Sequence, residues 1–220
     1  MAVSVRDKLK AKKQAYVQEQ IAAAAAKLFA ERGYRAVTID DIASSLGYTK
    51  SVVFYYFKNK GQLLWAIFDQ IQEAYASDIK AIMAMKLPTE FLFREMIKRH
   101  AINNMERSDW TAIYSRDDSE LPDSKRQIIK NKKKEYDNLF RKVYEDGVAE
   151  GVFRRMPTYV VVGGILGMCN WSHQWYKKSG RFSAAEIADY YVAILSDGLN
   201  TQPRSASRAG DSEPPARKAV

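Results

Sequence analysis

The sequence predicts an all-α protein in which a small N-terminal three-helix domain precedes a larger helical bundle. Apolar residues recur at helical spacing along most of the chain, and no stretch alternates strictly enough to indicate a β-strand. Hydrophobic residues make up 46% of the composition, which is ample for a packed core. Proline, which interrupts helices, is confined to six positions: Pro88, Pro122, Pro157, Pro203, Pro214 and Pro215.

The first helix is predicted over residues 10–32. Ile21, Ala25 and Phe29 lie on one stripe of this helix, as expected for a helix with a buried face. Gly33 follows directly and is a typical C-terminal stop, because glycine adopts the left-handed backbone at little cost.

Residues 38–57 carry signals for two short helices joined by a tight turn. Thr38 stands where an N-cap belongs, and Asp41 can reach back to it as in a capping box. Gly47 allows the left-handed turn that follows, and Thr49 is placed to cap the second helix.

The second of these short helices has the pattern of a recognition helix. Lys50, Ser51 and Val52 form its exposed first turn, whereas Val53 and Phe57 point toward the core one helical turn apart. Small or polar residues at such a helix start can approach base edges, and tyrosines and lysines behind them can bind phosphates. We therefore predict a helix-turn-helix that reads double-stranded DNA.

Further helical patterns make up the rest of the chain. They run over residues 60–84, 90–104, 110–115, 124–147, 158–177 and 183–199. The β-branched run 159–162 follows Pro157 at a natural helix start and is interpreted as part of a buried helix. From residue 201 the chain is rich in Pro, Ser and Ala, which predicts a disordered tail. The predicted organisation is a DNA-binding domain over 10–70, a larger all-helical domain over 71–200, and a tail over 201–220.

Charge and composition narrow the class of partner and the compartment. The formal net charge is +9, from 35 Lys and Arg against 26 Asp and Glu, and indicates an anionic partner such as nucleic acid or an anionic membrane surface. The one cysteine, Cys169, has no partner for an intramolecular disulfide. The N-terminus lacks the apolar region of a secretory signal, and the longest apolar run, 159–171, falls short of the roughly 20 residues of a membrane span. We expect a cytoplasmic, nucleoid-associated protein with no membrane partner.

The sequence shows no pattern of an enzyme or a metal site. An enzyme would need a nucleophile with a base, paired carboxylates or a phosphate-binding glycine loop. Asp117 and Asp118 are adjacent in a predicted loop, where helix capping is the favoured role. His100 and His173 are the only histidines and have no ligands at metal-binding spacing. We expect no catalytic residue, no metal and no cofactor.

The helix-turn-helix residues resemble the N-terminal domain of the tetracycline-repressor (TetR) family. That family's pattern has an alanine-rich first helix and a glycine, then T-x-x-x-I-A and L-G-V-S-x-x-x-x-Y-x-x-F-x-x-K-x-x-L. The matching positions are Phe29, Gly33, Thr38, Ile42, Ala43, Leu46, Gly47, Thr49, Phe57, Lys60 and Leu63. The resemblance implies DNA contacts to bases or phosphates, at Thr38, Thr49, Lys50, Ser51, Val52, Tyr55, Tyr56 and Lys60.

Two positions depart from the family pattern. Phe54 replaces the motif tyrosine, and Tyr56 replaces a frequent histidine. We expect Phe54 to pack in the core and Tyr55 to meet a phosphate, because three successive aromatic residues cannot share one helix face. The basic N-terminal residues either resemble DNA-contacting arms of some relatives or form a solvated tail; they are Arg6, Lys8, Lys10, Lys12 and Lys13.

The C-terminal region carries a second, looser resemblance, to TetR-family regulators that respond to fatty-acyl or steroid-derived coenzyme A thioesters. It rests on the pattern N-W-x-x-x-W-Y-x-x-x-G-x-x-S-x-x-E-I-A, here Asn170, Trp171, Trp175, Tyr176, Gly180, Ser183, Glu186, Ile187 and Ala188. Family members dimerise through their last two long helices and enclose a small-molecule pocket, so the resemblance implies that residues 71–200 form a ligand-binding and dimerisation domain. Large adaptable side chains available to line a pocket are Met96, His100, Met105, Trp110, Tyr114, Met168, Trp171 and Trp175.

Two further features of this region allow alternative interpretations. Gly163, Gly164 and Gly167 leave room for a partner helix or a ligand, and dimer packing is the favoured use. A basic cluster is either a solvated helix face, which is favoured, or a site for coenzyme A phosphates; it comprises Lys125, Arg126, Lys130, Lys132, Lys133 and Lys134.

The resemblance implies a mechanism based on a population shift. A homodimer places two recognition helices about one DNA turn apart on a palindromic operator, and a ligand that prefers another spacing weakens binding. The helix over 60–84, which touches both domains, is the expected lever. Repression is the usual outcome in the family, and activation and corepression stay open as alternatives for this chain. The alternatives are a regulator of another hydrophobic molecule or drug, and an architectural DNA-binding protein without a ligand.

Overall fold

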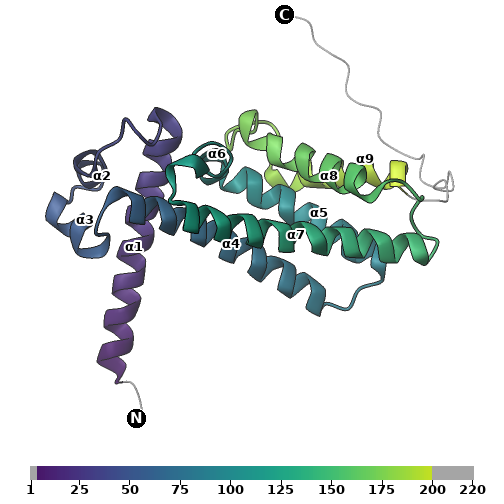
Figure 1. The fold of residues 1–220 in the computed structure, drawn as a ribbon, viewed down its shortest axis with the longest axis horizontal. Helices are drawn as coiled ribbons and strands as arrows, with labels where there is room; N and C mark the ends of the chain where they lie inside the picture. Colours follow the sequence, from purple (N-terminus) through teal and green to yellow (C-terminus); the bar gives the residue numbers. More distant parts are fainter. Residues whose placement is uncertain (1–3, 200–220) are drawn as a thin grey trace, which may run out of the picture.

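The structure, a computed structural model, describes residues 4–199 and confirms the predicted all-α class. Within this range the chain forms nine α-helices and two short 3-10 helices (Figure 1). The α-helices are α1 (Val5–Arg32), α2 (Ile39–Ser45), α3 (Lys50–Tyr56), α4 (Lys60–Ala84), α5 (Thr89–Glu106), α6 (Ser108–Arg116), α7 (Asp123–Ala149), α8 (Thr158–Trp171) and α9 (Ala184–Leu199). The 3-10 helices are η1 (Asp118–Glu120) and η2 (Ser172–Gln174). The predicted tail over 201–220 lies outside the described residues.

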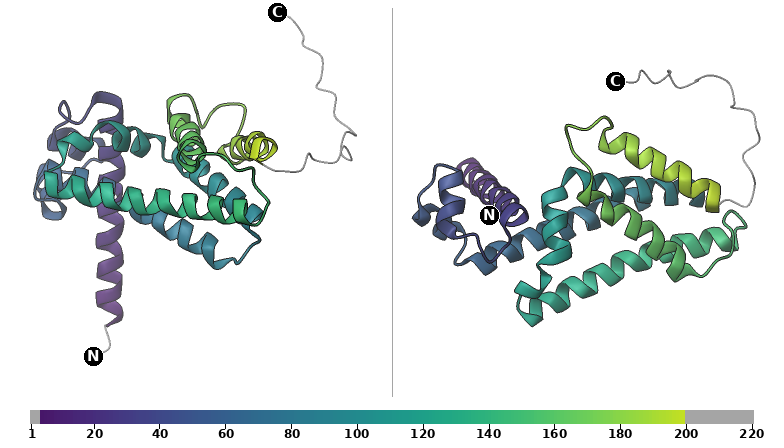
Figure 2. Two further views of the ribbon diagram at one scale, coloured as in Figure 1. Left: turned by 45° about the vertical axis from the view of Figure 1, so that its right-hand side comes forward. Right: turned by 90° about the horizontal axis from the view of Figure 1, so that it is seen from above.

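Helices α1, α2 and α3 pack together at one end of an elongated molecule, and the N-terminal half of α1 projects away from it (Figures 1 and 2). Phe29 of α1, Ile42 of α2 and Val53 of α3 are fully buried in their shared core. Gly33 ends α1 with φ of 84°, and its N–H donates to the carbonyl of Phe29 at 2.8 Å. The backbone in this left-handed region favours glycine, which explains the stop signal in the sequence.

The bundle of α4 to α9 forms the larger part of the molecule. Helix α5 contacts α4, α7, α8 and α9 and therefore lies at the centre of the bundle. Phe93 and Met96 of α5 and Phe140 and Tyr144 of α7 are almost completely buried there. Gly147 of α7 lies directly against the ring of Phe153, and a Cβ added at this glycine would overlap that ring.

Helix α4 joins the two cores, as the sequence predicted. Its first half, including Leu63 and Phe68, is buried in the N-terminal core, and Ile79 and Ile82 are buried in the bundle core. The N-terminal core also takes in residues well beyond the predicted boundary at 70. These are Ile71, Ile113, Leu121 and Ile129. Helices α6 and α7 thus pack against both parts of the molecule.

Two helix boundaries differ from prediction by more than two residues. Helix α1 begins at Val5 rather than near Lys10, since Ser4 provides an N-cap by accepting from the N–H of Asp7. Helix α8 ends at Trp171 instead of continuing to residue 177. The hydroxyl of Ser172 donates to the carbonyl of Cys169, and such local side-chain bonds compete with helical ones.

Candidate DNA-binding surface and effector cavity

The turn between α2 and α3 is built from the signals seen in the sequence. Thr38 Oγ1 accepts from the N–H of Asp41 at 3.1 Å, and the Asp41 carboxylate accepts from the N–H of Thr38 at 2.8 Å. The predicted capping box is therefore confirmed. The Thr38 hydroxyl also donates to the Asp41 carboxylate at 2.6 Å, and this bond, together with that from the Thr38 N–H, lowers the pKa of Asp41 below its ordinary value. Gly47 has φ of 69° in the turn, while Thr49 occupies the N-cap of α3 without a side-chain capping bond.

Helix α3 presents its first turn to solvent and its opposite face to the core. Lys50 and Ser51 are exposed and Val52 is partly exposed, whereas Val53 and Phe57 are buried, as predicted. The Lys50 ammonium lies 2.7 Å from a carboxylate oxygen of Asp40 on α2, an exposed ion pair. The side chains predicted to face bases are thus grouped on one solvent-facing surface.

The aromatic run at the end of α3 differs from prediction at one position. Phe54 is 43% exposed and does not pack in the core, because the buried face of α3 is already defined by Val53 and Phe57. Tyr55 is 69% exposed, and its hydroxyl accepts from Gln14 Nε2 of α1 at 3.3 Å. Gln14 therefore orients the tyrosine predicted to meet a phosphate.

Lys60 has a structural role that the sequence prediction missed. Its ammonium donates to the carbonyls of Tyr34 and Val37 at 2.9 Å each and to that of Arg35 at 3.4 Å. It also lies 4.4 Å from the centre of the Tyr34 ring. A lysine has three N–H donors, and here all three are directed at the connection between α1 and α2. Lys60 thus stabilises this connection, and its contact with a phosphate stays a prediction.

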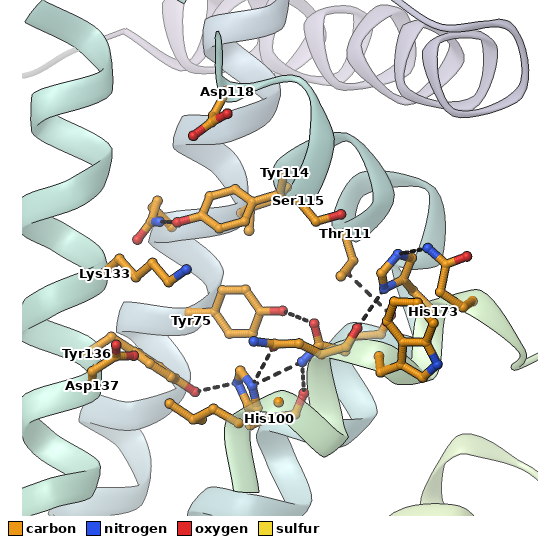
Figure 3. A pocket seen from close by; sticks show the side chains of 18 residues that line it. Tyr75, His100, Thr111, Tyr114, Ser115, Asp118, Lys133, Tyr136, Asp137 and His173 are labelled. Carbon is orange, nitrogen blue, oxygen red and sulfur yellow. Dashed lines mark hydrogen bonds between the residues drawn. The ribbon is translucent and has the colours of Figure 1, made fainter. Parts of the chain in front are cut away.

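A cavity of about 480 Å³ lies in the bundle between α4, α5, α6, α7 and α8 (Figure 3). Figure 3 shows open space bordered by Tyr75 of α4, Tyr114 of α6 and Lys133 of α7. Asp118 and Asp137 also line it. A volume of this size suits a drug-sized molecule or part of a larger one.

One wall of the cavity is a connected set of buried polar groups. His100 is fully enclosed; its Nδ1 lies 3.0 Å from the hydroxyl of Tyr136 and its Nε2 lies 3.0 Å from Oδ1 of Asn170. A neutral ring with its hydrogen on Nε2 satisfies both contacts. Tyr75 donates to Asn104 Oδ1 at 3.0 Å, which extends the network across α4 and α5. Burial lowers the pKa of His100 to about 4, so the ring is neutral at physiological pH.

The predicted pocket residues divide into two groups. His100, Tyr114 and Trp171 line the cavity. The other five do not: Met96 and Met105 are fully buried core residues, Trp110 packs against the N-terminal core, and Met168 and Trp175 lie elsewhere in the bundle. Selecting large apolar side chains missed the polar lining. A polar residue at a core position of a helix, such as Asn104 one turn after His100, was the available signal.

A second hollow, of about 510 Å³, adjoins the cavity and shares Tyr114, Asp118 and Lys133 with it. Arg126 and Lys130 of the predicted basic cluster also line it. The rest of that cluster is engaged elsewhere or lies outside this hollow. Lys132 pairs with Asp69 and Glu73, and Lys125 lies 4.0 Å from the centre of the Trp65 ring.

Helix α6 connects the cavity to the N-terminal core. Tyr114 and Ser115 line the cavity, and the next residue, Arg116, donates to the carbonyl of Phe29 at the end of α1 at 2.8 Å. In addition, an ion pair of 2.8 Å joins Arg35, in the connection between α1 and α2, to Glu120 of η1. Helix α6 and the 3-10 helix η1 that follows it thus contact the domain that carries α3.

Two family models match this chain over most of its length. Residues 21–67 match the model described as bacterial regulatory proteins of the tetR family. Residues 88–199 match the one described as the tetracyclin repressor-like C-terminal domain. This chain belongs to the TetR family. As a TetR-family protein it is a DNA-binding transcriptional regulator and not an enzyme.

The TetR assignment extends to full-length relatives. The chain is 26% identical over 195 residues to the HTH-type transcriptional repressor KstR2 of Mycolicibacterium smegmatis, covering 83% of this chain and 90% of KstR2. It is 27% identical over 183 residues to the regulator HbdR of Aromatoleum, covering 81% of this chain and 78% of HbdR. Both resemblances include the two domains.

Solved TetR-family structures share the fold. The ketosteroid transcriptional regulator KstR2 of Mycobacterium tuberculosis aligns with a TM-score of 0.80 at 21% identity, over 84% of this chain and 95% of that one. AibR, solved in complex with isovaleryl coenzyme A and operator DNA, aligns with a TM-score of 0.71 at 24% identity, over 81% of this chain and 97% of AibR. At these identities the likeness establishes the architecture of the TetR protein.

Residues 4–199 of this TetR-family chain have neither a membrane-spanning helix nor a metal-binding cluster. This range contains no helix with the length and apolar character needed to cross a bilayer. It also contains no group of three or more His, Cys, Asp or Glu side chains placed to hold a metal ion.

Proposed function

We propose that this TetR-family protein is a homodimeric repressor that binds a palindromic operator and is released from it by an acyl-CoA thioester. The observation that carries this proposal is the cavity of the bundle, which adjoins a hollow lined by three basic and two acidic side chains and contacts the DNA-binding domain through α6. Its relatives KstR2 and AibR are, respectively, a transcriptional repressor and a protein solved with a coenzyme A thioester and operator DNA.

The DNA contacts are assigned to one surface. Thr38 and Thr49 stand at the starts of α2 and α3, where helix N-termini attract phosphate oxygens. The first turn of α3 is directed at base edges, and the tyrosines at its end are directed at the DNA backbone. These side chains are Lys50, Ser51, Val52, Tyr55 and Tyr56. A regulator of this kind acts at the chromosome, and we therefore place it in the cytoplasm at the nucleoid.

Dimerisation is assigned to the outer faces of α8 and α9. Tyr159 and Trp171 of α8 are 69% and 65% exposed, and Tyr190 and Ile194 of α9 are 56% and 64% exposed. Large apolar side chains exposed on the surface of two helices are typical of a protein interface. A Cβ added at Gly163, Gly164 or Gly167 would meet open space, so these positions allow close approach of a second copy.

The ligand class follows from the chemistry of the two hollows. A thioester with an apolar acyl group would fill the cavity, and its nucleotide phosphates would lie in the adjoining hollow beside Arg126, Lys130 and Lys133. Lys130 and Lys133 form no ion pair with any described residue, which leaves their charges available to phosphates. The effector acts through differential affinity for two positions of α6, because only such a difference shifts a conformational equilibrium.

The DNA-binding assignment is tested by removing two side chains from α3. In a fluorescence anisotropy titration with a selected operator at moderate salt, Lys50→Ala combined with Tyr55→Ala should weaken binding by roughly 100-fold. Lys142→Ala is a matched control, because Lys142 also forms an exposed pair with an aspartate, at 2.8 Å, but lies on α7. Intact operator binding by the double variant would refute the assignment of α3.

The ligand class is tested by a thermal-shift screen of acyl-CoA thioesters against unrelated hydrophobic drugs. A thioester that binds the native state raises the melting temperature and lowers operator affinity in the anisotropy assay. Lys130→Ala with Lys133→Ala should reduce the shift given by thioesters but not that given by the matching free fatty acids. A shift with drugs alone would favour a regulator of another hydrophobic molecule, and no shift with any compound would favour an architectural protein.

A further inference from the structure

An apolar groove of about 400 Å³ runs between α4 and α7, separate from the hollow with the basic side chains. Its α4 side is a stripe of Ala76, Ile79 and Met83, spaced at roughly one helical turn, and Leu139 faces them from α7. From Ala76 to Met83 the stripe extends about 10 Å along α4. The groove is open to solvent, and Met83 is 36% exposed.

The groove and the effector cavity share a wall made of two side chains, Gln72 of α4 and Tyr136 of α7, which line both spaces. Each is held by a hydrogen bond to a residue of the cavity. Gln72 Nε2 donates to the hydroxyl of Tyr114, and the hydroxyl of Tyr136 lies 3.0 Å from Nδ1 of His100 (Figure 3). A ligand that engages Tyr114 or His100 competes directly for these bonds.

The helices on either side of this wall are fixed independently of it. Lys132 of α7 lies 3.2 Å from Asp69 and 3.0 Å from Glu73 of α4. With α4 and α7 joined by these ion pairs, a passage through the wall requires rotation of the Gln72 and Tyr136 side chains, which is far faster than helix displacement.

We propose that the groove is a second binding subsite, which takes the distal part of an acyl chain that passes between Gln72 and Tyr136. This inference rests on the proposed acyl-CoA effector and adds the length of chain that the protein accepts. A short acyl group is contained in the cavity, whereas a longer one displaces the two side chains and lies against Ala76, Ile79 and Met83. The side chains of Gln72 and Tyr136 separate the groove from the cavity. This arrangement selects the distal part of the ligand's own acyl chain as the occupant of the groove.

The test fills the groove without altering the cavity. Ala76 is exposed and lines only the groove, so Ala76→Phe places a ring in the proposed path of the chain. Ser77→Phe is the matched control, because Ser77 is an exposed neighbour on α4 that lines neither space. A second variant, Met83→Glu, puts a charge beside the chain at a position that is already exposed to solvent.

Affinities are measured by calorimetry for the butyryl, octanoyl and lauroyl thioesters of coenzyme A. The wild-type protein should bind progressively tighter along this series, by up to roughly four-fold for each methylene group buried. Ala76→Phe and Met83→Glu should each lose about ten-fold or more for the lauroyl thioester while binding the butyryl thioester as the wild type does. Ser77→Phe should follow the wild type throughout.

Operator binding without ligand verifies that each variant is folded. If thioesters bind the wild type but Ala76→Phe and Met83→Glu retain its full preference for the lauroyl chain, the groove subsite is refuted and the proposed effector class stands. If no thioester of any length binds the wild type, both the groove subsite and the effector class are refuted.

Discussion

The enclosed imidazole of His100 should make the stability of the folded protein depend on pH. Its pKa falls from 6.5 in an unfolded chain to about 4 in the folded protein, because burial penalises the charged ring. A difference of this size corresponds to about 3 kcal/mol of folding free energy. The nearby hydroxyls of Tyr75 and Tyr136 have pKa values raised by burial and stay neutral across the acidic range.

The direction of the effect follows from proton binding. Between pH 6.5 and 4 the unfolded chain binds a proton at His100 that the folded protein does not bind. The contribution of the neutral ring is therefore fully present above pH 6.5 and is lost as the pH falls through this interval. The free energy of unfolding should decrease by about 3 kcal/mol from this residue alone between pH 7 and 4.

Urea unfolding followed by circular dichroism at a series of pH values measures this slope. His100→Gln keeps a neutral polar side chain and should flatten the acidic decline, whereas His173→Gln should retain it, because His173 lies outside the buried network. Asp137, whose pKa is raised by burial, contributes equally to all three proteins and cancels in the comparison. An identical slope for wild type and His100→Gln below pH 6.5 would refute the reasoning.

Three further substitutions test contacts described above. Lys60→Met removes the donors to the α1–α2 connection and should lower the free energy of unfolding by about 2–3 kcal/mol, measured in urea. The salt dependence of its operator binding should match that of the wild type; a slope reduced by about one would instead reveal a phosphate contact. Gly147→Ala forces a Cβ into the ring of Phe153 and should cost about 1–3 kcal/mol, so an unchanged melting temperature would contradict the packing. Arg116→Gln removes the hydrogen bond to the carbonyl of Phe29. The effect of a bound thioester on operator affinity, measured by anisotropy, should then shrink by roughly five-fold or more. The affinity for the thioester itself, measured by calorimetry, should be retained.

Local signals in the sequence predicted much of the N-terminal domain. The capping box of Thr38 and Asp41 and the stop at Gly33 each depend on residues a few positions apart, so pattern and structure agree. Helix α4 has the predicted bounds, residues 60–84, for the same reason. The fold class and the family also follow from short-range patterns, and both are confirmed.

Sequence prediction was incomplete for Lys60 and wrong for Phe54, because the surroundings of a side chain depend on distant parts of the chain. Lys60 matches a motif position, but its ammonium is directed at carbonyls more than 20 residues earlier. Phe54 was expected in the core because it is apolar, yet the packing of α3 leaves it at the surface.

The sequence by itself determined the helical class, the helix-turn-helix and the surface of α3 that faces solvent, because these depend on helix periodicity and on caps within a single turn. Only the tertiary structure decided which side chains line the cavity of the bundle. His100, Tyr136 and Asn170 come from three helices, and their hydrogen bonds exist only once α5, α7 and α8 are packed together. No local pattern encodes such an arrangement, since burial of a polar group becomes favourable only when its partners arrive from elsewhere in the fold.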